Sequence, residues 1–144
     1  MATEPRWKDS PPSETDAHHV SRFTGALADV TGARLAAEDF LRGLARDAPP
    51  SSPDHLDDVL LVVAELAANA VQYAPGPFEL RMGRTSDGVH VVMCDSSTTR
   101  PTPRRFRPHN GGGGIGWYLI EVLGEQVSVV PHEHGKDIHV FLPW

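Results

Sequence analysis

The sequence predicts an α/β fold, a two-layer sandwich in which helices cover one face of a mixed, mostly antiparallel sheet. Two observations carry this prediction. In the first half of the chain apolar residues recur at spacings of three and four, which is typical of amphipathic helices, and in the second half they recur with the shorter period of strands. A chain of 144 residues holds one buried core and is too short for two, so we expect a single domain.

The domain is expected to span residues 21–144, after a disordered tail over residues 1–20. This tail combines charges, serine and proline with few side chains able to bury surface. It has no apolar stretch that resembles a signal peptide, and no tract elsewhere reaches the ~20 apolar residues that a bilayer requires. We therefore expect a cytoplasmic protein without membrane contact.

Two helices are expected first. Apolar side chains spaced by three and four predict a helix over residues 31–46, which ends before the APPSSP loop. The same spacing predicts a second helix up to about Tyr73, with Ser52 as a candidate cap and Pro53 in its first turn. The APGP segment at residues 74–77 ends this helix.

The rest of the chain is predicted to consist of strands, one long loop and one short helix. A turn at residues 86–88 between two hydrophobic runs is typical of an antiparallel hairpin. Residues 96–113 lack hydrophobic periodicity, and a loop of that length usually serves a function. In chain order we expect strands over 78–85 and 89–95, the loop, a helix from about 114, and strands over 126–130 and 137–143.

Charge and cysteine content exclude some classes of protein. The 19 acidic and 13 basic residues give a formal net charge of −6, which argues against direct nucleic-acid binding by counterion release. The single cysteine, Cys94, excludes an internal disulfide framework and a cysteine-ligated zinc, and it fits a reducing compartment.

The second predicted helix carries two polar side chains one turn apart. Glu65 and Asn69, at positions i and i+4, share one side of that helix, beside its apolar stripe. A carboxylate and a carboxamide there could hold Mg²⁺, which accepts one or two protein oxygens and keeps water and phosphate as its other ligands. The glutamate could also act as a base. The alternative is a helix with two solvated polar residues.

Asp95 closes a hydrophobic strand and precedes a Ser-Ser-Thr segment. A carboxylate at the point where the chain leaves a sheet can accept a hydrogen bond from an amine on a ligand, such as the exocyclic group of adenine. The alternative is an Asp-Ser turn in which the side chain bonds its own backbone.

A glycine run at residues 111–116 opens the third predicted helix. Residues without a Cβ let backbone N–H groups crowd around an anion, and a helix N-terminus adds positive potential, so the run is a candidate phosphate cradle. The alternative is a flexible linker. The candidates are Gly112, Gly114, Ile115 and Gly116 in the run and, upstream, four arginines that could reach a terminal phosphate: Arg100, Arg104, Arg105 and Arg107.

In this order, the Glu-x-x-x-Asn helix, the strand-end aspartate, the long loop and the glycine run resemble the GHKL (Bergerat-fold) ATPase superfamily. The segments LLVVAELAANAVQYA, VVMCDSSTTRP and GGGIGWYLIEVLG are most similar to the stand-alone anti-sigma-factor serine kinases of actinobacterial type, over about residues 30–143. The resemblance implies ATP and Mg²⁺ as cofactors and these roles: Mg²⁺ ligation by Asn69, general base catalysis by Glu65, adenine binding by Asp95, and backbone contacts to phosphate by Gly112, Gly114 and Gly116.

The chain departs from the superfamily pattern in two places. The first glycine box, Asp-x-Gly-x-Gly in the superfamily, is Asp95-Ser96-Ser97-Thr98-Thr99 here. The Gly-Thr near the last pair of strands is Gly135-Lys136-Asp137. The first departure bears on adenine affinity and on the flexibility of the loop, and the second on a phosphate or base contact.

The function implied by the resemblance is that of an ATP-binding serine/threonine protein kinase and anti-sigma factor in a partner-switching system. Its partners would be a sigma factor and an anti-sigma-factor antagonist, which it would phosphorylate on a serine, and it could form a homodimer. The alternative is a catalytically silent ATP-binding module that binds a regulatory protein without phosphoryl transfer.

Overall fold

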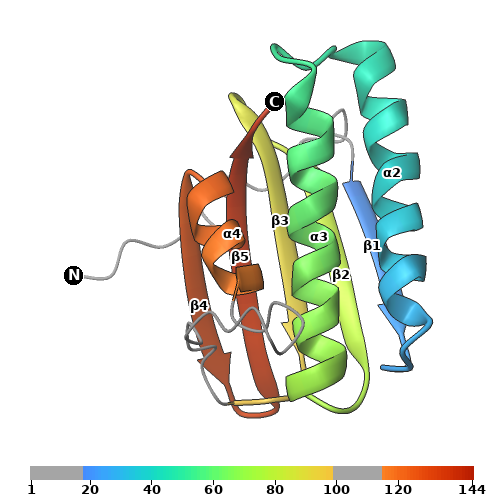
Figure 1. The fold of residues 1–144 in the computed structure, drawn as a ribbon, viewed down its shortest axis with the longest axis vertical. Helices are drawn as coiled ribbons and strands as arrows, with labels where there is room; N and C mark the ends of the chain where they lie inside the picture. Colours follow the sequence, from blue (N-terminus) through green and yellow to red (C-terminus); the bar gives the residue numbers. More distant parts are fainter. Residues whose placement is uncertain (1–17, 99–114) are drawn as a thin grey trace.

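The computed structural model describes residues 18–98 and 115–144. Within these ranges the chain forms one five-stranded sheet with the strand order β1-β2-β3-β5-β4, and every pairing is antiparallel. The three described helices lie on one face of this sheet, with α2 over β1 and β2, α3 over the centre and α4 beside it (Figure 1). The predicted two-layer α/β sandwich is therefore confirmed.

The expected helices and hairpins are all present, and their ends differ from the prediction by a few residues. The second helix begins at Asp54 with Pro53 at its N-cap position and no side-chain cap, so the prediction of Ser52 as the cap is wrong, although the Ser52 Oγ accepts a hydrogen bond from the N–H of Asp54 at 3.4 Å. The elements are β1 (His18–Phe23), α2 (Asp29–Asp47), α3 (Asp54–Tyr73), β2 (Phe78–Arg84), β3 (Gly88–Asp95), α4 (Ile115–Leu123), β4 (Gln126–His132) and β5 (Gly135–Pro143).

The strand β1 was not predicted, and its first three residues lie in the segment expected to be a disordered tail. For residues 18–20 that prediction is wrong; residues 1–17 lie outside the described part of the chain. The six residues of β1, HHVSRF, contain little apolar surface, so their own composition gives a weak strand signal. Pairing with β2 along the whole strand specifies β1 instead, and the Phe23 ring stacks on Phe78 with 5.0 Å between centroids.

The hydrophobic core lies between the helices and the sheet. Alternate residues of β3, Val89, Val91 and Met93, face the buried sides of α2 and α3, because side chains of a strand alternate between its two faces. In β5 the same parity applies to Ile138 and Val140, which are also buried. None of the helices in the described ranges combines the length and apolarity that a membrane crossing requires.

One end of the sheet gathers the segments that carry the candidate residues. The chain leaves α3 at Tyr73 and enters β2 after a short loop, and the start of β2 pairs with the end of β3. The C-terminus of α3 and the end of β3 therefore lie at the same end, the lower one in Figure 1. We call it the Asp95 end, and the opposite one, where β3 begins, the Gly88 end.

Loops at the Asp95 end pack closely against one another. The Oγ of Ser96 donates a hydrogen bond to the carbonyl oxygen of Pro77 at 2.7 Å, which ties the loop after β3 to the loop after α3. Gly25 and Gly76 both adopt positive φ, 97° and 120°, and a Cβ added at Gly25 would overlap the Gly76 carbonyl oxygen. Glycine is favoured by the positive φ at both positions, and at Gly25 also by the lack of space for a side chain.

The face of the sheet opposite the helices carries a stack of three rings. His90 and His139 are 6% and 1% exposed, with 3.0 Å between His90 Nε2 and His139 Nδ1, and Phe141 lies parallel to His90 at a centroid distance of 4.3 Å. Burial, followed by the proximity of His139, lowers the pKa of His90 to about 3. On the same face, burial and the nearby Asp137 raise the pKa of the Cys94 thiol to about 12.

The lowered pKa of His90 predicts that the protein loses stability in mild acid. Between the unfolded value of 6.5 and the folded value of about 3 the unfolded chain binds more protons, so the free energy of unfolding falls as the pH drops through this window. The contribution is up to about 1.4 kcal/mol per pH unit well inside the window. Denaturant unfolding at pH 7.5, 6 and 5 measures it.

The matched variant is His90→Phe, which keeps a ring in the stack but removes the titrating group. Its free energy of unfolding should fall less steeply with decreasing pH than that of the wild type. Parallel pH dependences in the two proteins would show that His90 is not the group responsible.

Candidate functional site

Glu65 and Gly116 are in direct contact, although they belong to different helices. Gly116 lies in the first turn of α4, and a Cβ added there would overlap Oε2 of Glu65 and lie 3.1 Å from its Cδ. The carboxylate therefore occupies the space that a side chain at residue 116 would take, and a larger residue there would displace it. This contact brings the predicted Glu-x-x-x-Asn helix and the end of the predicted glycine run to one place.

The environment of Glu65 changes its acidity. The side chain is half-buried on α3, and desolvation by this burial raises its pKa above the ordinary glutamate value of 4.5. A carboxylate with a raised pKa is a stronger base than an exposed one. The site thus holds a carboxylate with the chemical character that proton abstraction requires.

Asn69 follows Glu65 by one turn on the same side of α3 and is also half-buried. Between and beside them Leu66, Ala67 and Ala70 are at most 2% exposed, which shows that this helix turns its apolar side to the sheet and leaves the two polar side chains at the margin. Asn69 is the nearer of the two to the Asp95 end, where α3 finishes.

Asp95 is the last residue of β3, with the same parity as the helix-facing Met93, and its side chain is only 3% exposed. Its Oδ1 accepts a hydrogen bond from the N–H of Ser97 at 2.9 Å. The turn in which the side chain bonds its own backbone, one of the two alternatives for this residue, is therefore present.

The main partner of Asp95 is Lys136, which the sequence analysis did not identify as a site residue. The Lys136 Nζ lies 2.8 Å from Oδ2 of Asp95 in an ion pair, and it donates hydrogen bonds to Oδ1 of Asp95 at 3.0 Å and to the Ser97 carbonyl oxygen at 3.2 Å. The lysine side chain is 6% exposed. A buried ion pair thus occupies the position where a ligand amine was expected.

A signal for Lys136 exists in the sequence. In β5, Lys136 shares the inward parity of Ile138, Val140 and Leu142, all of which are buried, and a charged residue at such a position is almost never buried without a partner. The close approach of β5 to the end of β3 depends on Gly135, since a Cβ there would overlap the Asp95 carbonyl oxygen.

The structure places only part of the predicted phosphate cradle. The helix expected from about residue 114 is present as α4, which is described from Ile115, within the run at residues 111–116. The side chain of Ile115 and the whole of Arg100, Arg104, Arg105, Arg107, Gly112 and Gly114 lie outside the described residues.

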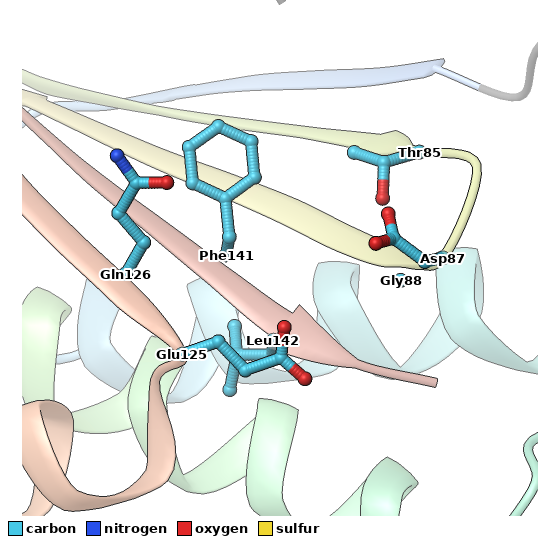
Figure 2. A pocket seen from close by; sticks show the side chains of 7 residues that line it. All are labelled: Thr85, Asp87, Gly88, Glu125, Gln126, Phe141 and Leu142. Atoms are coloured by element: carbon cyan, nitrogen blue, oxygen red, sulfur yellow. The ribbon is translucent and has the colours of Figure 1, made fainter. Parts of the chain in front are cut away.

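A pocket of about 230 Å³ lies at the Gly88 end of the sheet. Figure 2 shows its lining side chains, which come from the β2–β3 turn, the start of β4 and the end of β5. Seven residue steps along β3 separate Gly88 from Asp95, or about 23 Å at the usual rise of a strand. This pocket is therefore distinct from the candidate site.

The residues at the Asp95 end fit a magnesium-bound triphosphate. In the described ranges no group of three or more His, Cys, Asp or Glu side chains is placed to hold a metal ion. Mg²⁺, however, takes few protein ligands when phosphate and water supply the others. A carboxylate beside the first turn of a helix, at a position without a Cβ, and a carboxamide one turn further along α3 are suitable for that arrangement.

The contact between Gly116 and Glu65 predicts the effect of a single methyl group. Gly116→Ala should be less favourable than a Gly→Ala change at an open helix position by up to about 1 kcal/mol, because the added methyl forces the end of the flexible Glu65 side chain to move. In the Glu65→Ala background the same change should be neutral or stabilising by up to ~1 kcal/mol, because the space is then free and alanine favours helix. Denaturant unfolding of the four proteins measures this coupling.

Gly43 in α2 is the matched control, since no atom lies within 4 Å of a Cβ added there. Gly43→Ala should stabilise the protein by about 0.4–1 kcal/mol. A Gly116→Ala variant as stable as Gly43→Ala would contradict the close approach of α4 to Glu65.

Comparison with known proteins identifies the family to which the domain belongs. The family model described as "Histidine kinase-like ATPase domain" matches residues 23–141. The Serine-protein kinase RsbW of Bacillus subtilis is 28% identical over 95 residues, which are 55% of this chain and 59% of the relative. The RsbW of Bacillus velezensis is 28% identical over 92 residues, 53% of this chain and 58% of the relative.

The match thus spans less than two thirds of the length of either relative. Among solved structures, the histidine kinase domain of the blue-light activated histidine kinase from Erythrobacter litoralis EL346 has a TM-score of 0.48 and 18% identity, covering 76% of this chain and 60% of that chain.

The family model spans the described helices and the described strands except most of β1 and the end of β5. The chain therefore belongs to the histidine kinase-like (GHKL) ATPase domain family.

Proposed function

We propose that the protein is an ATP-dependent serine/threonine kinase that acts in the cytoplasm as an anti-sigma factor. It would transfer a phosphoryl group from ATP to a serine of an anti-sigma-factor antagonist and bind a sigma factor in the alternative complex, with a homodimer as the working form. Family membership and the names of the RsbW relatives support the kinase class. The contact of the Glu65 carboxylate with the first turn of α4 is the observation that carries the proposal.

The triphosphate would bind at the N-terminus of α4. Backbone N–H groups in the first turn of a helix have no partner within the helix and favour an anion, and Gly116 adds no side chain beside them. The further phosphate contacts belong to the proposal alone: Gly112, Gly114 and the Ile115 backbone in the glycine run, and Arg104 and Arg105 on the terminal phosphate.

Asn69 would hold the magnesium ion through its carboxamide oxygen. When bound, the ion neutralises charge on the phosphate oxygens and so favours phosphoryl transfer. Asn69 is half-buried and lies one turn after Glu65 on the same side of α3, so its carboxamide is within the same part of the site.

Glu65 would act on the attacking serine hydroxyl. Its carboxylate orients the hydroxyl by accepting a hydrogen bond and takes the proton as the oxygen attacks. The raised pKa of Glu65 suits this role. Because protonation removes the base, the rate of transfer should fall as the pH drops toward the pKa of Glu65, which lies above the ordinary glutamate value of 4.5.

Phosphorylation would then separate the two proteins. A phosphoserine adds nearly two negative charges, and this chain carries a net charge of −6, so the modified antagonist is repelled and the kinase becomes available to the sigma factor. A polar interface of this kind responds to salt, because exposed charges are screened at physiological ionic strength.

A catalytically silent ATP-binding module is the second candidate function. The buried ion pair of Asp95 with Lys136 favours it. A carboxylate that is already paired with a lysine offers less binding energy to the base of a nucleotide, and a module that only binds a partner needs less affinity for the nucleotide than a kinase does. Transfer of labelled phosphate from ATP to a serine-bearing partner distinguishes the two functions.

Two substitutions test the roles of the α3 side chains. Glu65→Gln should bind Mg·ATP like the wild type but transfer phosphate ~100-fold more slowly, because the amide cannot accept the proton. Asn69→Ala should lose magnesium-dependent nucleotide binding while the fold stays intact. Calorimetric titration with Mg·ATP and transfer of labelled phosphate measure the two effects.

Gln72→Ala is the matched control, since it removes an exposed carboxamide from the same helix. It should leave both nucleotide binding and transfer unchanged. Equal turnover in Glu65→Gln would reduce Glu65 to a structural role, and unchanged affinity of Asn69→Ala at saturating Mg²⁺ would contradict the assignment of the metal ligand.

A further inference from the structure

The ion pair of Asp95 and Lys136 is built into the Asp95 end of the sheet. The two residues are direct partners in the pairing of β3 with β5, and both have the helix-facing parity of their strands. Their side chains are 3% and 6% exposed. The position of the ammonium group relative to the carboxylate is thus set by the strand register and by the packing around it.

The Lys136 ammonium group has three oxygen neighbours. It donates hydrogen bonds to Oδ1 of Asp95 at 3.0 Å and to the Ser97 carbonyl oxygen at 3.2 Å, and its Nζ lies 2.8 Å from Oδ2 of Asp95 in the ion pair. The Ser97 contact is the longest of the three and comes from the loop after β3. The Asp95 carboxylate, with about four acceptor positions, already accepts from Lys136 on both oxygens and from the Ser97 N–H.

This arrangement presents a donor and an acceptor side by side. A lone carboxylate would accept a hydrogen bond from a purine amine and repel a purine carbonyl oxygen at the same place. With Lys136 present, a carbonyl oxygen on the ligand can replace the Ser97 carbonyl oxygen on Nζ, because it is the same kind of acceptor. Discrimination between the two ligand groups is then weak.

We propose that Lys136 is a specificity-determining residue that makes the site accept purine triphosphates with a 6-carbonyl group nearly as well as those with a 6-amine. The inference rests on the proposed nucleotide site. It concerns the chemistry of the base and is independent of whether phosphate is transferred. Lys136 touches the base edge together with Asp95, and removal of the lysine charge leaves the carboxylate to select the amine.

Calorimetric titration of the full chain with Mg·ATP, Mg·ITP and Mg·GTP tests the proposal. The wild type should bind ATP and ITP with dissociation constants within about 5-fold of each other, a difference below the worth of one hydrogen bond. Lys136→Met, which keeps the length of the side chain, should weaken ITP and GTP relative to ATP by about 10- to 100-fold, the size of one charge-assisted hydrogen bond.

Lys136→Arg is the matched control, because it keeps the positive charge beside Asp95 and should keep the wild-type ratio of affinities within a few fold. Thermal melts show whether each variant is folded. If Lys136→Met fails to fold because it leaves a buried carboxylate unpaired, the wild-type ratio decides alone: near-equal affinities support the proposal and a preference for ATP above about 30-fold overturns it.

The outcomes separate this inference from the proposed function. Nucleotide binding with an unchanged ATP to ITP ratio in Lys136→Met overturns the role of Lys136 and leaves the kinase proposal standing. A wild type that binds none of the three triphosphates overturns the nucleotide site itself, and the specificity proposal with it.

Discussion

The carboxylate of Glu65 and the first turn of α4 share a space that one methyl group would fill. The contact places the end of the Glu65 side chain beside the first turn of α4, so an anion at that helix N-terminus would lie near the carboxylate. Close approach of a backbone to a side chain is one of the two reasons to use glycine, the other being positive φ. At Gly116 the reason is space, at Gly25 both reasons apply, and at Gly76 the reason is positive φ.

The second constraint at the site is electrostatic. Two charges at most 6% exposed in their side chains are tolerated only because each satisfies the other, since an ion removed from water without a partner costs several kcal/mol. The antiparallel register of β3 and β5 places them opposite each other, and Gly135 lets the two strands meet closely at that point. The position of the ion pair is therefore determined by the pairing of β3 with β5 and not only by the surrounding candidate site.

The helices and hairpins were predictable because each has a local signal, either the three-and-four spacing of α2 and α3 or the turn between β2 and β3. β1 has no such signal, as its short polar sequence becomes a strand only beside β2. At the site, the i and i+4 relation of Glu65 to Asn69 follows from helix geometry alone. The partner of Asp95 does not, because it depends on a register between strands about forty residues apart, which no local pattern contains.

The burial of the Cys94 side chain has a practical consequence for labelling the protein. It is the single cysteine of the chain, and a thiol with a pKa of about 12 has almost no thiolate at neutral pH, which is the form that alkylating dyes attack. A cysteine introduced at the exposed Thr98 would therefore be the group that reacts first. A fluorophore attached there would report on the loop beside Asp95 without prior removal of the native thiol.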